Sequence, residues 1–218
     1  MLLIRPPGVY PPQGDTELLA HCVRREPLDG SSRVLDLCTG TGAVALAAAR
    51  RGARVTAVDV STRAVATAWC NTRLHHRRVR LHRGDLLAPV AGQRFDLVTA
   101  NPPYVPAGPG RDGPGRGAAL AWDAGPYGRL VLDRICRTAP RVLTRGGVLL
   151  LVQSTLADVP ATLAVLRAAG LRADVAARRW QPFGPVMTAR AGLFEHLGLI
   201  SPGEREEELV VVRGVRGY

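Results

Sequence analysis

The chain has 218 residues and a formal net charge of +11, with 18 acidic residues and 29 basic residues that are all arginine. This length suits one domain with a full hydrophobic core, and we expect a single domain over residues 1–218. The charge indicates an acidic or nucleic-acid-associated partner or, equally, a biased composition, because the arginines are scattered along the chain. Aromatic residues make up only 5%, which argues against a stacking platform for single-stranded nucleic acid.

Cysteine spacing and hydropathy exclude further classes. The four cysteines form no Cys-x-x-Cys pair, so disulfide and zinc frameworks are not expected, and the adjacent His75 and His76 point in different directions on a helix. No apolar stretch reaches the ~20 residues of a membrane span, and no secretory apolar segment follows Met1. We therefore expect a cytoplasmic protein with reduced thiols, no metal and no membrane contact.

The first part of the chain, residues 1–30, is predicted as an extended segment followed by a helix. Residues 1–14 are rich in proline, and the helix is expected from Asp15 to Arg25. Asp15 or Thr16 is the predicted N-cap, because both residue types accept backbone hydrogen bonds at helix starts.

A strand, a glycine turn and a helix follow over residues 33–49. This order is typical of nucleotide-binding βα units, whose glycines let the backbone approach a ligand. The next strand, 55–58, ends in Asp59, which lies 23 residues after Asp36, in the range of an acid that binds ribose hydroxyls. The dinucleotide fingerprint is not met, because Ala45 stands where it needs its third glycine.

Two further strands are predicted before the middle of the chain. Ser61 is expected to cap the helix that follows the Asp59 strand and precedes these two strands. A short strand over 79–82 leads into Gly84-Asp85-Leu86, where Asp85 is either a ligand contact or a turn residue. The apolar run 95–100 is predicted as a buried strand that ends at Asn101-Pro102-Pro103-Tyr104.

This tetrapeptide has the chemistry to hold a planar NH2 group. The side-chain oxygen of Asn101 and the carbonyl of Pro102 are hydrogen-bond acceptors, and two consecutive prolines fix the backbone that carries them. Tyr104 adds a flat ring that can stack on a flat substrate. Strand ends of open α/β sheets are also where ligands bind, which favours a site over a simple proline-rich turn.

The second half of the chain is predicted with less local detail. The Gly/Pro/Arg segment 107–118 is expected to be flexible, either as a substrate flap or as an indifferent loop. The segment 178–185 is expected to contact a partner or to cover the edge of the sheet. The remaining elements are expected as a helix over 128–141, a strand over 148–152, helices over 155–169 and 188–197, and a strand over 209–212.

The motifs together resemble those of a known family. Asp36 to Gly42, Asp59 and Asn101 to Tyr104 are similar to the S-adenosylmethionine and amino-group motifs of class I methyltransferases, and in particular of the HemK-type enzymes that methylate glutamine in peptide-chain release factors. Residues 9–19 resemble the entry segment of that family, and residues 122–129 resemble its Gly-x-x-Gly loop. The resemblance covers roughly residues 9–153 and is to the short, single-domain branch.

The resemblance implies an α/β, Rossmann-like class I methyltransferase fold, with a seven-stranded, mostly parallel sheet and helices on both faces. It implies S-adenosyl-L-methionine as cofactor and Asn101, Pro102 and Tyr104 as catalytic residues. The cofactor-binding residues that it implies are Thr16, Asp36, Thr39, Gly40, Gly42, Asp59, Val60, Asp85, Leu86 and Asn101.

The resemblance also implies the substrate, which is a glutamine amide of a release factor or a similar protein, and allows for a small activator subunit. The alternative is methylation of the exocyclic amine of adenine in DNA or RNA, since both acceptors present a planar NH2 group. The chain shows no separate target-reading element of the kind that a sequence-specific DNA enzyme needs. A third, non-catalytic alternative is a scaffold that has kept only the cofactor fold.

Overall fold

The structure is a computed structural model that describes residues 2–110 and 117–217, and it contains one seven-stranded sheet in the order β3-β2-β1-β4-β5-β7-β6. Strands β1 to β5 pair in parallel, whereas β7 is antiparallel to both of its neighbours. The strands are β1 (Arg33–Leu37), β2 (Arg54–Asp59), β3 (Val79–Arg83), β4 (Phe95–Ala100), β5 (Leu143–Ser154), β6 (Leu171–Pro182) and β7 (Glu206–Arg216).

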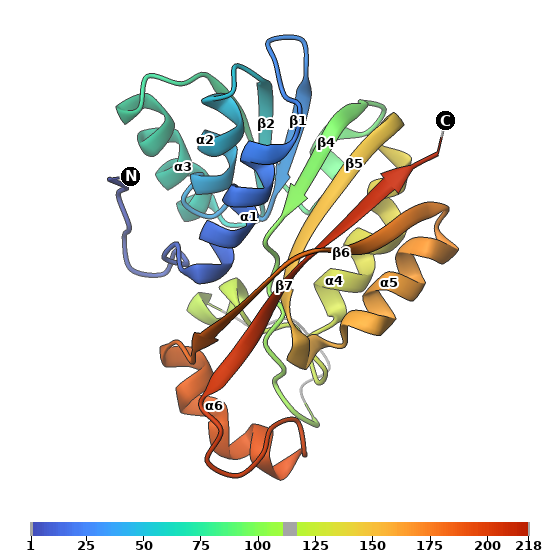
Figure 1. The fold of residues 1–218 in the computed structure, drawn as a ribbon. Helices are drawn as coiled ribbons and strands as arrows, with labels where there is room; N and C mark the ends of the chain where they lie inside the picture. Colours follow the sequence, from blue (N-terminus) through green and yellow to red (C-terminus); the bar gives the residue numbers. More distant parts are fainter. Residues whose placement is uncertain (1, 111–116, 218) are drawn as a thin grey trace.

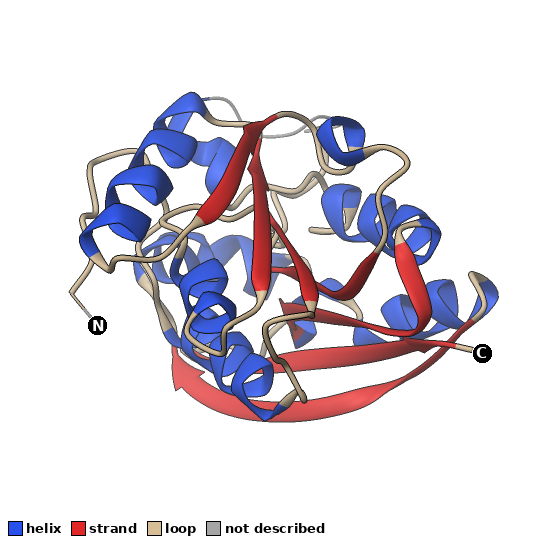
Figure 2. Cartoon of the chain, turned by 90° about the horizontal axis from the view of Figure 1, so that it is seen from above, coloured by secondary structure: helices blue, strands red, loops and turns tan. Residues whose placement is uncertain are grey.

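Helices cover both faces of the sheet (Figures 1 and 2). In Figure 1, α1, α2 and α3 gather beside β1 and β2, while α4 and α5 lie together beside β5 and β6, and α6 lies beyond the lower end of the sheet. The α-helices are α1 (Gly14–Arg25), α2 (Ala43–Ala49), α3 (Thr62–Leu74), α4 (Leu130–Thr138), α5 (Val159–Ala168) and α6 (Pro185–His196). Short 3-10 turns cover Ala88–Val90, Gly117–Ala121, Ala139–Arg141 and Thr155–Ala157.

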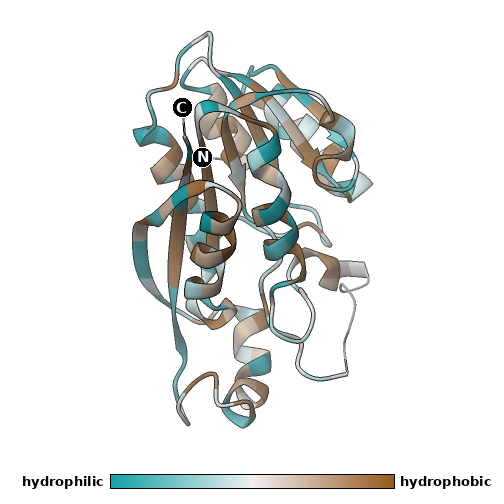
Figure 3. Cartoon of the chain, turned by 90° about the vertical axis from the view of Figure 1, so that its right-hand side faces the viewer, coloured by the Kyte–Doolittle hydropathy of each residue, from teal (hydrophilic) through white to brown (hydrophobic). Residues whose placement is uncertain are grey.

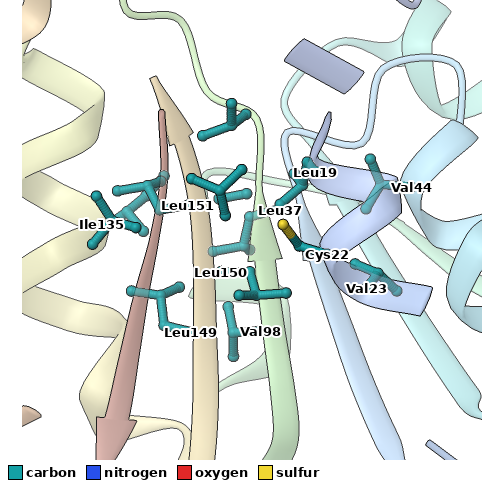
Figure 4. Close-up of a cluster of buried hydrophobic side chains, with 14 of the residues drawn as sticks. Leu19, Cys22, Val23, Leu37, Val44, Val98, Ile135, Leu149, Leu150 and Leu151 are labelled. Atoms are coloured by element: carbon teal, nitrogen blue, oxygen red, sulfur yellow. The ribbon is translucent and has the colours of Figure 1, made fainter. Parts of the chain in front are cut away.

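The core lies between the central strands and these helices. Strand β4 and the second half of β5 are buried almost throughout, as expected for strands that are covered on both faces. Figure 4 shows Leu19, Cys22 and Val23 of α1 packed toward Leu37 and Leu150 of the sheet. The hydropathy view agrees, since the inner strands are mainly brown and the outer surfaces carry most of the teal (Figure 3).

The topology brings the loops that follow the parallel strands and the start of β7 to the same edge of the sheet. Strands β1, β2, β3 and β4 all end at the carboxyl edge of the sheet because they are parallel. Strand β7 runs the other way and begins at that edge, since Leu209 pairs with Ser154, the last residue of β5. The segments after the parallel strands and the first residues of β7 are therefore neighbours.

Most predicted elements are present. The fold class is confirmed, and α2 and β4 match their predicted bounds. Ser61 caps α3 by accepting the N–H of Ala64 at 3.3 Å. The predicted N-cap of the first helix is wrong: Gln13 holds that position, and Asp15 and Thr16 lie inside the first turn, where their side chains are buried.

The region before α6 differs most from its prediction. No strand was predicted within the segment 178–185, but its first five residues form the end of β6 and pair with β7, from Arg178 with Val210 to Pro182 with Glu206. Pattern alone did not reveal this strand, because arginines and a tryptophan replace the usual apolar alternation at its end. The central part of the predicted flexible loop, 111–116, lies outside the described residues.

No helix among the described residues is long and apolar enough to cross a membrane.

Candidate active site

A pocket of about 430 Å³ opens at the carboxyl edge of the sheet, within the usual size range of small-molecule sites. It collects the predicted site residues from five separate segments of the chain. Those that line it are Thr16, Asp36, Thr39, Gly40, Asp59, Val60, Asp85, Leu86, Asn101, Pro102 and Tyr104. Among the predicted residues, Gly42 is not part of the lining.

The pocket has two ends. We call the region after β1, β2 and β3, with Asp36, Thr39, Gly40 and Asp59, the turn end. The region formed by the N-terminal segment and the β6–β7 hairpin we call the hairpin end; its polar residues are Tyr10, Asp15, Gln181 and Glu207. Asn101 to Tyr104 follow β4, which lies between the strands of the two ends in the sheet.

At the turn end, Asp59 organises the glycine turn. Its Oδ2 accepts the N–H of Gly40 at 2.9 Å, and its Oδ1 accepts the N–H of Ser61 at 2.9 Å. Burial raises the pKa of Asp59, and these backbone hydrogen bonds partly offset that rise. Asp59 is half-buried, and it supports the backbone of the turn as well as facing the pocket.

The turn itself requires left-handed backbone at several positions. Cys38, Gly40 and Gly42 have φ values of 55°, 53° and 80°. A Cβ on Gly40 would meet no atom within 4 Å, so that glycine leaves open space beside the pocket. A Cβ on Gly42 would lie 3.1 Å from the Cβ of Ala68, so Gly42 serves the start of α2 and its contact with α3.

Asp36 lies beneath this turn and is only 1% exposed. It accepts hydrogen bonds from the hydroxyls of Thr39 at 2.6 Å and Thr99 at 2.7 Å. Burial raises the pKa of Asp36 to about 6, although both hydroxyls act in the opposite direction. Asp36 thus ties the turn after β1 to the neighbouring strand β4.

The residues after β3 are more open. The side chain of Asp85 is 58% exposed and pairs with Arg134 of α4 at 2.5 Å. Leu86 has a left-handed φ of 48°, and Val60, which follows Asp59, is 48% exposed. These three residues form the outer rim of the turn end.

A hydrogen-bonded chain connects α1 with the residues after β4. Asp15 Oδ1 accepts the hydroxyl of Thr16 at 3.1 Å, and Thr16 Oγ1 in turn accepts Nδ2 of Asn101 at 3.2 Å. Asp15 Oδ2 accepts the hydroxyl of Tyr104 at 3.1 Å. Asp15 also accepts the N–H of Thr16, so three protein groups donate to this buried carboxylate.

This chain fixes the orientation of Asn101. Because Nδ2 is bound to Thr16, the amide oxygen is left as the free end, and no group among the described residues donates to it or to the carbonyl of Pro102. Tyr104 is 7% exposed, and burial, together with the nearby Asp15, raises the pKa of its hydroxyl. Tyr104 thus lines the pocket and also holds Asp15, a second task that was not predicted.

The predicted Gly-x-x-Gly loop returns to this motif. Val105 donates its N–H to Trp122 and accepts that of Ala124. A Cβ on Gly128 would lie 2.2 Å from the carbonyl oxygen of Tyr104, so only glycine permits this approach. Arg129 then anchors the loop to the segment after β5 through the carbonyls of Ala157 and Asp158.

Sequence reasoning missed three residues of the hairpin end. Tyr10 lies in the segment that resembled the family but received no role, and Gln181 was placed outside any strand. Glu207 is the middle of the run Glu206-Glu207-Glu208, which looks like a solvated surface. Only the alternation within β7 indicates that the middle glutamate faces inward.

The chain is similar to known proteins in both sequence and structure. The family described as the methyltransferase small domain matches residues 3–110. The protein named "Putative protein N5-glutamine methyltransferase" of Methanocaldococcus jannaschii is 32% identical over 187 residues, which are 85% of this chain and 92% of that protein.

The descriptions of two further relatives name the protein that is methylated. The ribosomal protein uL3 glutamine methyltransferase of Bradyrhizobium diazoefficiens is 47% identical over 122 residues, 53% of this chain but only 38% of that protein. Among solved structures, the E. cuniculi Mtq2-Trm112 complex, described as responsible for methylation of the translation termination factor eRF1, matches with a TM-score of 0.67 and 25% identity over 96% of this chain and 99% of that one.

Proposed function

Because the chain belongs to the HemK-type, S-adenosylmethionine-dependent N-methyltransferases, we propose that it methylates the side-chain amide nitrogen of a glutamine in a protein. One observation in particular supports a planar NH2 group as the methyl acceptor. The free oxygens of Asn101 and Pro102 lie together at the pocket, and the Asn101 amide is held by Thr16 in the orientation that presents its oxygen.

The cofactor of this family is S-adenosyl-L-methionine, and the turn end fits it. The left-handed Gly40 leaves open space where a Cβ would lie, and the Asp59 carboxylate faces the pocket at the end of the second strand. We assign Asp59 to the ribose hydroxyls, Gly40 and Thr39 to the amino-acid part, and the Asp85–Leu86 rim to the adenine. Asp36 and Gly42 support the turn from behind.

When bound, the cofactor supplies a methyl group on a cationic sulfonium, which loses its charge as the methyl group is transferred. The acceptor nitrogen takes the methyl group and releases one of its two protons to solvent, and positioning supplies most of the acceleration. Asn101 and the Pro102 carbonyl accept the two N–H groups of the acceptor amide and favour the conformation in which the nitrogen lone pair is localised. Tyr104 packs beside the amide plane.

The acceptor protein is the finer part of the proposal. The relatives act on a ribosomal protein and a translation termination factor, and we favour a release factor because the solved relative spans nearly the whole of this chain. That relative is a complex of two proteins, so we include a small activator subunit as partner. A single methyltransferase domain that acts in the cytoplasm is part of the same proposal.

The test is direct. The chain, with and without a co-expressed activator, is incubated with methyl-labelled cofactor and separately with release factor, ribosomal protein uL3, tRNA and duplex DNA. We expect label on a glutamine of one protein, identified by mass spectrometry, and labelling about 10²–10³ slower when the Asn101→Ala variant is used. Label on adenine of the nucleic acids, with none on protein, would overturn the proposed acceptor.

A further inference from the structure

The hairpin end contains one buried carboxylate that the steps above do not use. Glu207 is the second residue of β7, lines the pocket and is 4% exposed. Its Oε1 accepts Nε2 of Gln181 at 3.0 Å from the neighbouring strand. Its Oε2 is buried and has no hydrogen-bond partner among the described residues.

The two carboxylates of the hairpin end differ in this respect. Both oxygens of Asp15 receive protein donors. Glu207 interacts with Gln181 and with the hydroxyl of Ser154, yet its Oε2 has no hydrogen-bond partner among the described residues. Burying a carboxylate oxygen without a donor is costly, so a native protein seldom keeps one without a reason. Burial also raises the pKa of Glu207, the hydrogen bonds from Gln181 and Ser154 act in the opposite direction, and the nearby Asp15 adds to the rise.

The neighbours of Glu207 hold its side chain in a fixed position. Gln181 is held between Glu207 and the first turn of α1, where a Cβ on Gly14 would lie 1.9 Å from its Oε1. Glycine at position 14 therefore gives Gln181 the room to present its amide to Glu207. The missing side chain at Gly14 and the cross-strand pairing of Gln181 with Glu207 together place the Gln181 amide against the Glu207 carboxylate.

The position of Glu207 indicates which ligand it meets. Strand β7 lies on the far side of β4 from β1, β2 and β3, whose ends carry Asp36, Asp59 and Asp85. The turn end therefore belongs to the cofactor, and a ligand that passes Asn101 toward the hairpin end is the acceptor. A polypeptide acceptor carries N–H groups beside the glutamine that is methylated, and a carboxylate oxygen is the group that pairs with them.

We propose that Glu207 and Gln181 form an acceptor subsite in which Glu207 Oε2 takes an N–H group of the acceptor polypeptide beside the methylated glutamine. This inference rests on the proposed function and names the residue that recognises the acceptor rather than the one that reacts. An adenine in a stacked or flipped state offers its NH2 group to Asn101 and Pro102 and has no adjacent chain of N–H donors for this subsite.

The experiment uses Glu207→Gln in the full chain, with release factor as the acceptor probe and, if needed, the activator. Glutamine keeps the volume, but an NH2 group can take the place of the free acceptor oxygen. We expect KM for the acceptor to rise about 10- to 100-fold, as for the loss of a charge-assisted hydrogen bond, with unchanged cofactor affinity. Because the buried charge is removed, the melting temperature should stay equal or rise, as at functional sites that trade stability for binding.

Glu206→Gln is the matched control, since it makes the same change one residue earlier on the same strand at an exposed position. It should leave KM and melting temperature unaltered. If wild-type enzyme labels the release factor and Glu207→Gln does so with the wild-type KM, the subsite is refuted while the proposed function stands. If Glu207→Gln lowers the melting temperature and cofactor affinity together, Glu207 is a structural residue and the subsite is also refuted. If the wild type labels neither release factor nor uL3, the proposed acceptor class fails first and the subsite with it.

Discussion

The turn end and the hairpin end of the pocket are both acidic, but they treat their carboxylates differently. At the turn end, Asp36 is satisfied by two threonine hydroxyls and Asp59 by two backbone N–H groups. At the hairpin end, Asp15 is satisfied by Thr16 and Tyr104, whereas Glu207 keeps an oxygen without a donor.

The difference separates a preformed site from one that a ligand completes. The turn end is finished by the protein itself, as suits a cofactor that every turnover requires. The hairpin end lacks one donor, as suits a macromolecular acceptor that arrives and leaves. Asn101 lies between the two ends and takes its orientation from Asp15 through Thr16. One hydrogen-bonded chain therefore links the hairpin end, where the acceptor is recognised, to the residue that holds the reacting amide.

The largest expected effect is at this junction. Asn101→Ala should lower kcat by about 10²–10³ at saturating cofactor, the range for loss of one preorganised hydrogen-bonding group. Asn101→Asp should fail nearly as badly, because it keeps an acceptor but loses the N–H that binds Thr16, whose own proton is given to Asp15. Thr16→Val should cost less, about tenfold. A fully active Asn101→Asp enzyme would show that the Thr16 contact does not orient the amide.

The second effect concerns the pH dependence of stability that the buried Asp36 of the turn end produces. The rise in the pKa of Asp36 from its ordinary 3.8 to about 6 means that the folded state holds the proton more tightly, so stability should fall by about 3 kcal/mol as pH rises from below 4 to above 6. Asp36→Asn should remove this loss, which urea unfolding at about pH 3.5 and pH 7.5 would measure. Asp29 provides a control of opposite sign, because hydrogen bonds from Ser31 and Ser32 lower its pKa to about 2 and its contribution is lost on acidification.

The third effect concerns cofactor affinity. Asp59→Ala should weaken S-adenosylmethionine binding by about 1–3 kcal/mol, measured by calorimetry, because it removes the proposed ribose contact. It should also lower the melting temperature, since Gly40 and Ser61 lose their backbone acceptor. Asp174→Ala, at an 86% exposed position on β6, should alter neither quantity. Unchanged affinity in a folded Asp59→Ala protein would contradict the ribose assignment.

The smallest effect tests the hairpin end without touching Glu207. Tyr104→Phe keeps the ring and removes one of the donors to Asp15, so the free energy of unfolding should fall by about 1–2 kcal/mol. Turnover should drop only modestly, because Thr16 still binds both Asp15 and Asn101. Thermal unfolding and initial rates of the same preparation would measure the two changes. A large loss of rate with unchanged stability would assign the hydroxyl to the reaction instead.

How far the sequence predicts this molecule depends on the kind of signal. Strand ends with Asp59 and Asn101 were predictable because apolar strands, glycine turns and strand-end polar residues are local patterns. The partners of those residues were not, because the contacts of Asn101 with Thr16 and of Tyr104 with Asp15 join residues more than 80 positions apart. Strand β6 and the inward side of Glu207 were hidden by charge, since arginine and glutamate at these positions look like solvent-exposed chain.

The two outer strands of the sheet, β3 and the twelve-residue β6, each pair with only one other described strand and leave their outer edge unpaired. Such edges invite a second copy to add its own strand, and proteins obstruct this with charge and with irregular pairing. Exposed arginines lie along both edges, at Arg80 and Arg83 of β3 and at Arg172, Arg178 and Arg179 of β6, and the register of β6 shifts between Val175 and Ala177. Lysine is the residue that most often charges the edges of sheets, and in this chain, which has no lysine, arginine takes that place. Part of the large positive charge therefore hinders aggregation through the sheet edges rather than attracting a partner.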